Sequence, residues 1–235
     1  MKSDKKGKPV GKKGDSTKSW AKMFLVLGCI LFVGVMIITS LGTNWLVTMN
    51  PAKTGDTAII DLTIRDSQGR PVLTTNARIF NTSYEKGEVV WYTNPLTMAV
   101  NSTSTEMISP LPVYRYDYGE ASFALFGDEL SQISSALEGM KQGGSEKIVF
   151  ENSDQLQRDM TPEQFAQMGG NSTTAVPGDQ LLLAFTTNPM LNMDDNSTPQ
   201  YALRTSVITG KTSENVTVNY GYPSADISIV RLNHA

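Results

Sequence analysis

Apolar and polar positions divide the chain into an uninterrupted apolar run over 23–47, which carries no charged residue, and a long following part of short alternating stretches. The first of these stretches is Thr57–Ile64, where Ile60, Leu62 and Ile64 fall on one face of a strand. Five further stretches are strand-like: Ser145–Phe150, Gln180–Thr186, Tyr201–Thr209, Asn215–Tyr220 and Asp226–Leu232. The pattern therefore predicts a part that is dominated by strands.

One segment has the periodicity of a helix instead. Its apolar residues recur at spacings of three, four and seven and form a stripe: Leu130, Ile133, Ala136, Leu137 and Met140. Gly143-Gly144 ends this helix, and a short helix start is predicted at Met160–Phe165.

Residues 74–122 are rich in Asn, Ser, Thr and Tyr and contain two glycosylation sequons. We expect a long excursion that contains strands at Glu88–Tyr92 and Val113–Tyr118. Its tyrosines Tyr114, Tyr116 and Tyr118 alternate, so they share one strand face.

The apolar run 23–47 predicts a transmembrane anchor. As a helix it would reach roughly 37 Å, more than the ~30 Å of a bilayer core. Eight lysines precede it, which predicts a single-pass protein of the cell membrane with a cytoplasmic N-terminus and its domain outside. A cleaved signal peptide would have a shorter apolar core and a small-residue cleavage site, neither of which is present.

The formal net charge of −3 separates along the chain into +6 for residues 1–22 and −9 for the rest. The basic segment is predicted to be a cytoplasmic tail, and the acidic remainder excludes nucleic acid as its partner. Cys29 and His234 are the single cysteine and histidine, which excludes an intramolecular disulfide, a His/Cys metal cluster and a histidine-based hydrolase site in the domain. No metal or cofactor is expected.

Five sequons follow the apolar run and none precedes it, which agrees with an outward-facing domain. The possible N-glycosylation sites are Asn81, Asn101, Asn171, Asn196 and Asn215.

Two segments carry a resemblance to a known family. The stretch GDTAIIDLTIRDSQGRPV resembles the first long strand and turn of FKBP-type peptidyl-prolyl isomerases. LSQISSALEGMKQGGSEKIVF is similar to that family's helix and next strand, with its L-x-G-M-K-x-G core at Leu137–Gly143. MTPEQF, AVPGDQLLLAF and VTVNYGYPSADISIVRL resemble the flap insert of the SlyD-like long form and the last strand. The resemblance covers roughly residues 55–73 and 121–232.

The resemblance implies an α+β fold, an antiparallel FKBP-like half-barrel sheet wrapped on one helix with a small, mostly β insert domain. The transmembrane helix would precede it. The expected organisation is a basic tail 1–22, an anchor 23–47, a linker 48–56, an FKBP-like domain 57–150 plus 219–235 with the extra loop 74–122, and an insert 151–218.

The resemblance also implies a prolyl isomerase that assists protein folding and acts on proline-containing or unfolded polypeptides. Its apolar pocket would hold a proline ring at six positions: Leu62, Val72, Leu73, Phe123, Leu130 and Ile133. At the positions of Leu62, Leu73 and Ile133 the family has a tyrosine, an aspartate and a tryptophan, respectively. We therefore expect weak activity.

Two other functions stay open. The first is an inactive FKBP-like holdase whose insert binds unfolded chains. Its candidate binding residues, which could instead form the insert's own small core, are Phe165, Met168, Met190, Leu191 and Met193. The second is a structural or interaction protein of the cell envelope, favoured by the 74–122 excursion. Sequence patterns give no prediction of oligomeric state.

Overall fold

A computed structural model describes residues 16–40, 50–186 and 200–235. The chain forms two compact units, Met1–Val47 and Thr48–Ala235, which are described separately. In the first unit a single helix, α1 (Ser16–Ser40), is described.

No helix among residues 16–40, 50–186 and 200–235 combines the length and the apolar character that crossing a membrane requires. The membrane-spanning part of the predicted fold is therefore not found. Helix α1 begins in the polar tail, with Lys18 and Lys22, and its description ends at Ser40, so its apolar part from Met23 measures about 27 Å. Residues 41–47 of the predicted anchor lie outside the described residues, and the membrane location stays a prediction.

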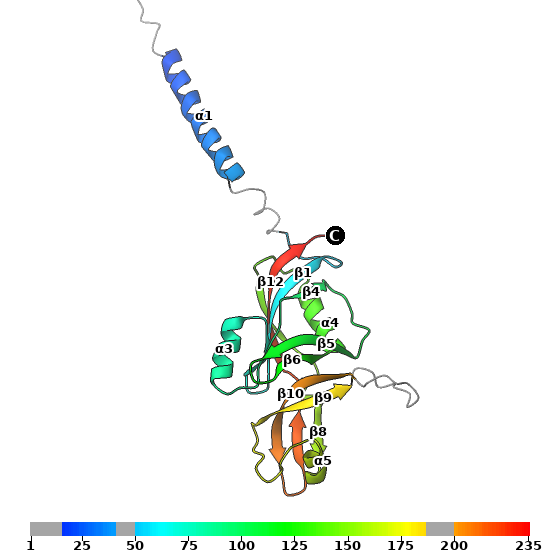
Figure 1. The fold of residues 1–235 in the computed structure, drawn as a ribbon. Coiled ribbons are helices and arrows are strands. Elements are labelled where there is room, and N and C mark those ends of the chain that lie inside the picture. Colours follow the sequence, from blue (N-terminus) through cyan, green and yellow to red (C-terminus); the bar gives the residue numbers. More distant parts are fainter. Residues whose placement is uncertain (1–15, 41–49, 187–199) are drawn as a thin grey trace, which may run out of the picture. The chain divides into compact units, whose positions relative to one another are not determined.

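The second unit is built on one sheet, which has twelve strands among the described residues (Figure 1). The strands are β1 (Thr57–Arg65), β2 (Pro71–Thr74), β3 (Trp91–Tyr92), β4 (Leu96–Ala99), β5 (Ile108–Arg115), β6 (Gly119–Phe126), β7 (Ser145–Val149), β8 (Gln157–Met160), β9 (Gln180–Thr186), β10 (Tyr201–Lys211), β11 (Val216–Asn219) and β12 (Ser224–Asn233). They pair in the order β7-β12-β1-β2-β3-β5-β6-β10-β11-β8, with β4 against β1 and β9 against β10. Its helices are α3 (Ala77–Glu85), α4 (Gly127–Ala136), α5 (Pro162–Gln167) and the 3₁₀ turn η1 (Ser153–Gln155).

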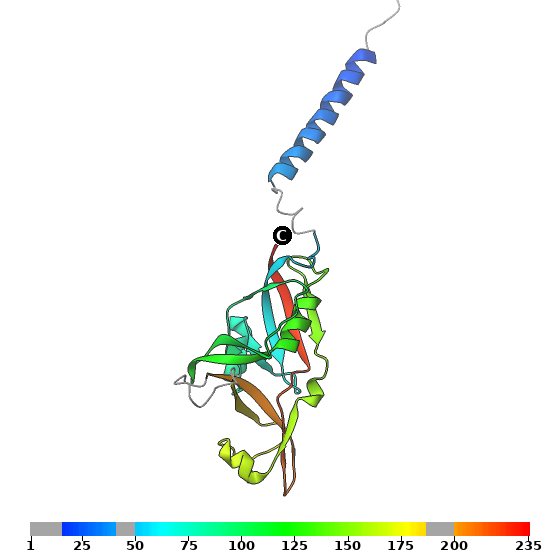
Figure 2. The same cartoon turned by 90° about the vertical axis from the view of Figure 1, so that its right-hand side faces the viewer.

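Strand β1 lies at the centre of the main core. Its predicted inward residues Ile60, Leu62 and Ile64 are buried, because successive side chains of a strand point to opposite faces. Helix α4 adds Ile133 to the same core, and the following turn adds Leu137. In the two views α4 lies across the sheet beside β1 and β12 (Figures 1 and 2).

The predicted fold class, an antiparallel half-barrel wrapped on one helix, was wrong. The sheet is mixed, since β2 pairs with β3 in parallel and β6 meets β10 in parallel. A parallel pair needs a crossover, which α3 provides between β2 and β3. The segment 74–122 therefore does not form a protruding loop: it supplies strands to the sheet and the fully buried Trp91 to the core.

A second, smaller core lies within residues 160–218. It gathers seven buried apolar residues: Met160, Phe165, Ala175, Leu183, Ile208, Val216 and Val218. Phe165 of the holdase hypothesis is thus a core residue, whereas Met168 is 45% exposed. Met190, Leu191 and Met193 lie outside the described residues.

Asp56 ties the start of β1 to the end of the chain after β12. Its carboxylate accepts hydrogen bonds from the backbone N–H groups of Lys53 (2.9 Å) and Ala235 (3.1 Å), and it lies 2.8 Å from Nδ1 of His234. Together these contacts hold the pKa of Asp56 below its ordinary value, with the Lys53 hydrogen bond contributing most.

Because that pKa is lower in the folded state, the contribution of Asp56 to stability is present at neutral pH and is lost as the pH falls through about 4 and below. We expect Asp56→Asn to be less stable than the wild type at pH 7 in urea unfolding. The difference should shrink towards pH 3, and a difference that is independent of pH would contradict this assignment.

Candidate functional site

A cavity of about 500 Å³ opens beside the N-terminus of α4, and we call it the aromatic pocket. The segments that line it are 104–108, the start of α4, the turn after β7, β9 and the residues between β11 and β12. Five aromatic side chains line it: Phe126, Phe150, Phe185, Tyr220 and Tyr222. Its wall is therefore built from segments that are far apart in the sequence.

Three half-buried rings of this wall, Phe126, Phe185 and Tyr220, contact one another, and we call them the aromatic triad. The ring centroids are 5.6 Å apart for Phe126 and Phe185, 5.6 Å for Phe185 and Tyr220, and 6.3 Å for Phe126 and Tyr220. The two pairs that include Phe126 are edge-to-face and the Phe185–Tyr220 pair is tilted, and edge-to-face geometry is favourable for aromatic pairs. The triad therefore offers apolar ring surface to a ligand in the pocket.

A buried ion pair packs against the rings of Phe126 and Tyr222. Arg204 on β10 has no exposed surface, and its Nη1 and Nη2 lie 3.0 and 2.5 Å from the two carboxylate oxygens of Glu129. The guanidinium also lies 3.9 Å from the ring centroid of Phe126 and 4.0 Å from that of Tyr222. It donates further hydrogen bonds to the backbone carbonyls of Tyr220 and Ala124. These contacts hold two pocket rings and the β11–β12 connection in fixed positions.

The charge state of this pair follows from its surroundings. Burial disfavours a charged guanidinium, but the charge and hydrogen bonds of Glu129, with smaller contributions from Tyr222 and Tyr220, together outweigh that cost and raise the pKa of Arg204 above its ordinary value. Burial likewise raises the pKa of Tyr222, whose hydroxyl donates to the carbonyl of Thr205 at 2.8 Å. Both groups therefore keep their protons, and they act as structural parts of the pocket rather than as acid or base.

One hydroxyl and three carboxylates of the pocket are available to a ligand. No hydrogen bond engages the hydroxyl of Tyr220 within the described part of the chain. Three exposed carboxylates line the pocket without an ion-pair partner in that part: Glu106, Asp128 and Glu151. The pocket is thus apolar at its wall, has one free phenol and carries negative charge. Residues 16–40, 50–186 and 200–235 contain no cluster of three His, Cys, Asp or Glu side chains placed to hold a metal ion.

The structure brings the six predicted pocket residues together, but in the core. Leu62, Val72, Leu73, Phe123 and Ile133 are at most 1% exposed, and Leu130 is half-buried against them. None of the six lines the aromatic pocket. Leu62 borders a different, polar groove of about 430 Å³. Trp91 and Tyr222 belong to the same buried cluster, and Tyr222 stacks on Phe123 at 6.1 Å. Binding of proline at these six positions stays a prediction.

The sequence interpretation did not identify Arg204 or the aromatic triad. One signal was present: Arg204 is the single charged residue between Tyr201 and Gly210, a stretch that otherwise reads as a buried strand. A charge in such a stretch requires a partner. A second signal was the glycine between two aromatic residues in Tyr220-Gly221-Tyr222. In the structure, a Cβ on Gly221 would lie 2.0 Å from the Ser153 carbonyl oxygen. Only a glycine permits that approach.

The predicted sequons differ in accessibility. Asn81, Asn101 and Asn171 are exposed and Asn215 is half-buried. The side-chain nitrogen of Asn101 donates to Thr54 and Glu138, so attachment of a glycan there would disturb both hydrogen bonds. Asn196 lies outside the described residues. Occupancy of these sites stays a prediction.

Models of known protein families give no match to this chain. A search of curated proteins gives no match either.

Proposed function

We propose that the unit 48–235 binds extended polypeptide segments in the aromatic pocket, places a proline ring against the aromatic triad and accelerates isomerisation of the preceding peptide bond. The observation that supports this proposal is the cluster of Phe126, Phe185 and Tyr220 around a cavity of about 500 Å³. A cavity of that size holds a few residues of an extended peptide.

Isomerisation requires no nucleophile, metal or cofactor. The barrier of ~18–20 kcal/mol arises from amide resonance, which separates charge along the O–C–N group. Water stabilises that separation, so transfer of the bond to an apolar wall favours the twisted amide. The aromatic triad supplies the apolar wall, and the Tyr220 hydroxyl would donate a hydrogen bond to a backbone carbonyl of the bound segment.

The activity itself is tested by two-dimensional NMR exchange on a peptide with one X-Pro bond, in the presence of the full-length protein. Exchange between cis and trans cross-peaks that is faster than in the peptide alone is the expected result. An exchange rate equal to that of the free peptide at saturating protein would reject isomerase activity.

The substitution Tyr220→Phe separates the role of the Tyr220 hydroxyl from that of its ring. We expect the variant to bind the peptide about 3- to 10-fold more weakly, because one neutral hydrogen bond contributes about 1 kcal/mol and the apolar surface is unchanged. Tyr201→Phe, which removes an exposed hydroxyl that does not line the pocket, is the matched control. Equal affinities of the two variants would show that the Tyr220 hydroxyl does not bind the segment.

The unpaired carboxylates Glu106, Asp128 and Glu151 should set a charge preference. We expect a peptide with lysine on either side of the proline to bind more tightly than the same peptide with glutamate. The difference should shrink from 20 mM to 500 mM NaCl, because salt screens exposed charges. Titrations of both peptides at the two salt concentrations measure it, and a preference for glutamate would contradict the proposed binding site.

The same pocket also favours the holdase hypothesis as a second candidate, because its aromatic wall can bind an apolar segment whether or not a peptide bond is twisted there. A holdase would bind the peptide without accelerating exchange. Saturable binding combined with the uncatalysed rate in the exchange experiment would identify that function.

A further inference from the structure

A second cavity, of about 550 Å³, lies between the β1–β2 turn and one face of α3, and we call it the cationic groove. Four basic side chains line it: Arg65, Arg70, Arg78 and Lys86. The single acidic residue among its lining residues is Glu88. This positive charge stands out because the chain after residue 22 has a net charge of −9. Arg65 and Arg70 are paired with Asp226 and Asp66. The unpaired cations Arg78 and Lys86 outnumber Glu88, so the groove attracts anions.

The α3 side of the groove presents two basic side chains that form no ion pair within the described residues. Arg78, Thr82 and Lys86 follow one another at intervals of four residues, so they lie on one face of the helix and its C-terminal end. Neither cation has an ion-pair partner within residues 50–186 and 200–235. Ser83 also lines the groove and is 4% exposed. The α3 side of the groove therefore offers two unpaired cations to an anion.

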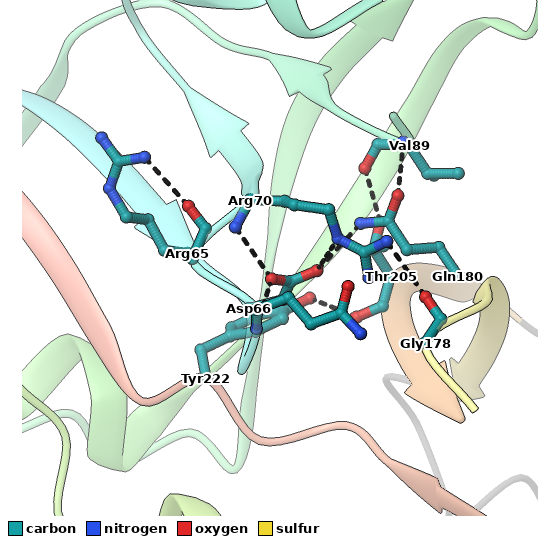
Figure 3. A network of polar contacts seen from close by, with 10 residues as sticks. Arg65, Asp66, Arg70, Val89, Gly178, Gln180, Thr205 and Tyr222 are labelled. Carbon is teal, nitrogen blue, oxygen red and sulfur yellow. Dashed lines mark hydrogen bonds and ion pairs between the residues drawn. The ribbon is translucent and has the colours of Figure 1, made fainter. Parts of the chain in front are cut away.

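On the opposite side, Arg70 is held rigidly (Figure 3). Its Nε lies 2.8 Å from the carboxylate of the buried Asp66, and its Nη1 donates to the carbonyl of Gly178 at 3.0 Å. Gln180 donates to the same Asp66 carboxylate at 3.1 Å. The remaining nitrogen, Nη2, is buried and has no partner among the described residues. Arg70 is therefore fixed in place with one donor unused.

Glu88 carries an unused acceptor, because its Oε2 is buried without a partner among the described residues. A buried donor or acceptor without a partner costs about 1–3 kcal/mol, so such groups are typically satisfied by a ligand or by water. A ligand that satisfies both Arg70 and Glu88 must accept hydrogen bonds on one side and donate one on the other.

We propose that the cationic groove binds a phosphate group that carries a hydroxyl proton, on the phosphorus itself or on the attached alcohol. Its oxygens accept hydrogen bonds from Arg70, Arg78 and Lys86, and its hydroxyl donates a hydrogen bond to Oε2 of Glu88. Sulfate matches phosphate in size and shape but has no proton at neutral pH, so the groove should discriminate between the two ions. The proposal is independent of the aromatic pocket.

Isothermal titration of the full-length protein with inorganic phosphate and with sulfate at pH 7 and constant ionic strength tests this site. We expect saturable phosphate binding that is about tenfold tighter than sulfate binding, the effect of one hydrogen bond to a charged group. Glycerol 3-phosphate and vesicles of phosphatidylcholine with phosphatidic acid then distinguish a soluble phosphate ester from a lipid headgroup. Equal affinities for phosphate and sulfate would overturn the proposed role of Glu88, and no saturable binding of either would overturn the site.

Variants locate the binding. Arg78→Ala with Lys86→Ala removes two unpaired cations, and we expect phosphate affinity to fall at least about tenfold. The matched control is Arg158→Ala with Arg231→Ala, two exposed cations on β8 and β12 that do not line the groove. Glu88→Gln should bring the phosphate-to-sulfate affinity ratio close to one. An equal loss of affinity in the control and in the groove variant would show non-specific attraction and overturn the site.

Discussion

Arg204→Met is expected to destabilise the unit 48–235 by about 3–5 kcal/mol, because it leaves the Glu129 carboxylate buried and without its cationic partner. Methionine keeps most of the apolar stem of arginine, so loss of packing volume contributes little. The substitution also removes the donors to the Tyr220 and Ala124 carbonyls. Chemical denaturation monitored by tryptophan fluorescence measures the free energy of unfolding.

A double variant tests whether the loss of stability comes from the unpaired Glu129 carboxylate. Arg204→Met combined with Glu129→Leu removes both charges, so the double variant should be more stable than Arg204→Met alone. If Arg204→Met costs less than about 1 kcal/mol, the pair is not buried as the structure places it. If the double variant is the less stable one, the two charges are not coupled.

Phe185→Ala is expected to weaken binding of a proline-containing peptide by about 10- to 100-fold. Phe185 is half-buried on β9 and contributes ring surface to the pocket through its contacts with Phe126 and Tyr220. Removal of a central aromatic anchor at a binding site commonly costs 1–3 kcal/mol or more. Fluorescence anisotropy of a labelled peptide measures the affinity.

The control for that variant is Tyr201→Ala. Tyr201 lies on the neighbouring strand β10, is 58% exposed and does not line the pocket. Its removal should leave peptide affinity within about twofold of the wild type. Equal loss of affinity in both variants would show that binding depends on general aromatic surface. Unchanged affinity in Phe185→Ala would show that the peptide does not occupy the pocket.

The sequence predicted local elements well where periodicity was strong. The inward alternation of Ile60, Leu62 and Ile64 is confirmed in β1, and Gln180–Thr186 forms β9 as predicted. The helix that was predicted through Met140 ends at Ala136, and a turn then leads to Gly139, whose φ of 83° only glycine adopts readily. Local sequence thus indicated elements but was less accurate about their ends.

Helix α3 was not predicted, for a physical reason. Its sequence ARIFNTSYE contains Asn, Thr and Ser, which favour helices weakly. Its start is stabilised by Asn76, whose side chain accepts hydrogen bonds from the N–H groups of Arg78 and Ile79. The resemblance instead implied an extra loop over 74–122, because the family has no helix at that place.

Long-range pairing explains the remaining differences. Contacts such as Leu203 with Phe123, which join β10 to β6 in parallel, link residues that are 80 positions apart and have no local signature. The predicted pocket residues came from the resemblance alone, and Trp91 and Tyr222 pack into the same core. The aromatic pocket could not be predicted because its five aromatic residues come from segments between Phe126 and Tyr222 that only the fold brings together.

The central claim is that a proline-containing peptide binds at the aromatic triad. The most direct test is a titration of the full-length protein, with ¹³C-labelled phenylalanine and tyrosine rings, by a peptide with one X-Pro bond. We predict saturable shifts of the Phe126, Phe185 and Tyr220 ring signals, with the buried Phe123 affected less. Saturable shifts confined to other rings, or no shift of the triad at millimolar peptide, would contradict the claim.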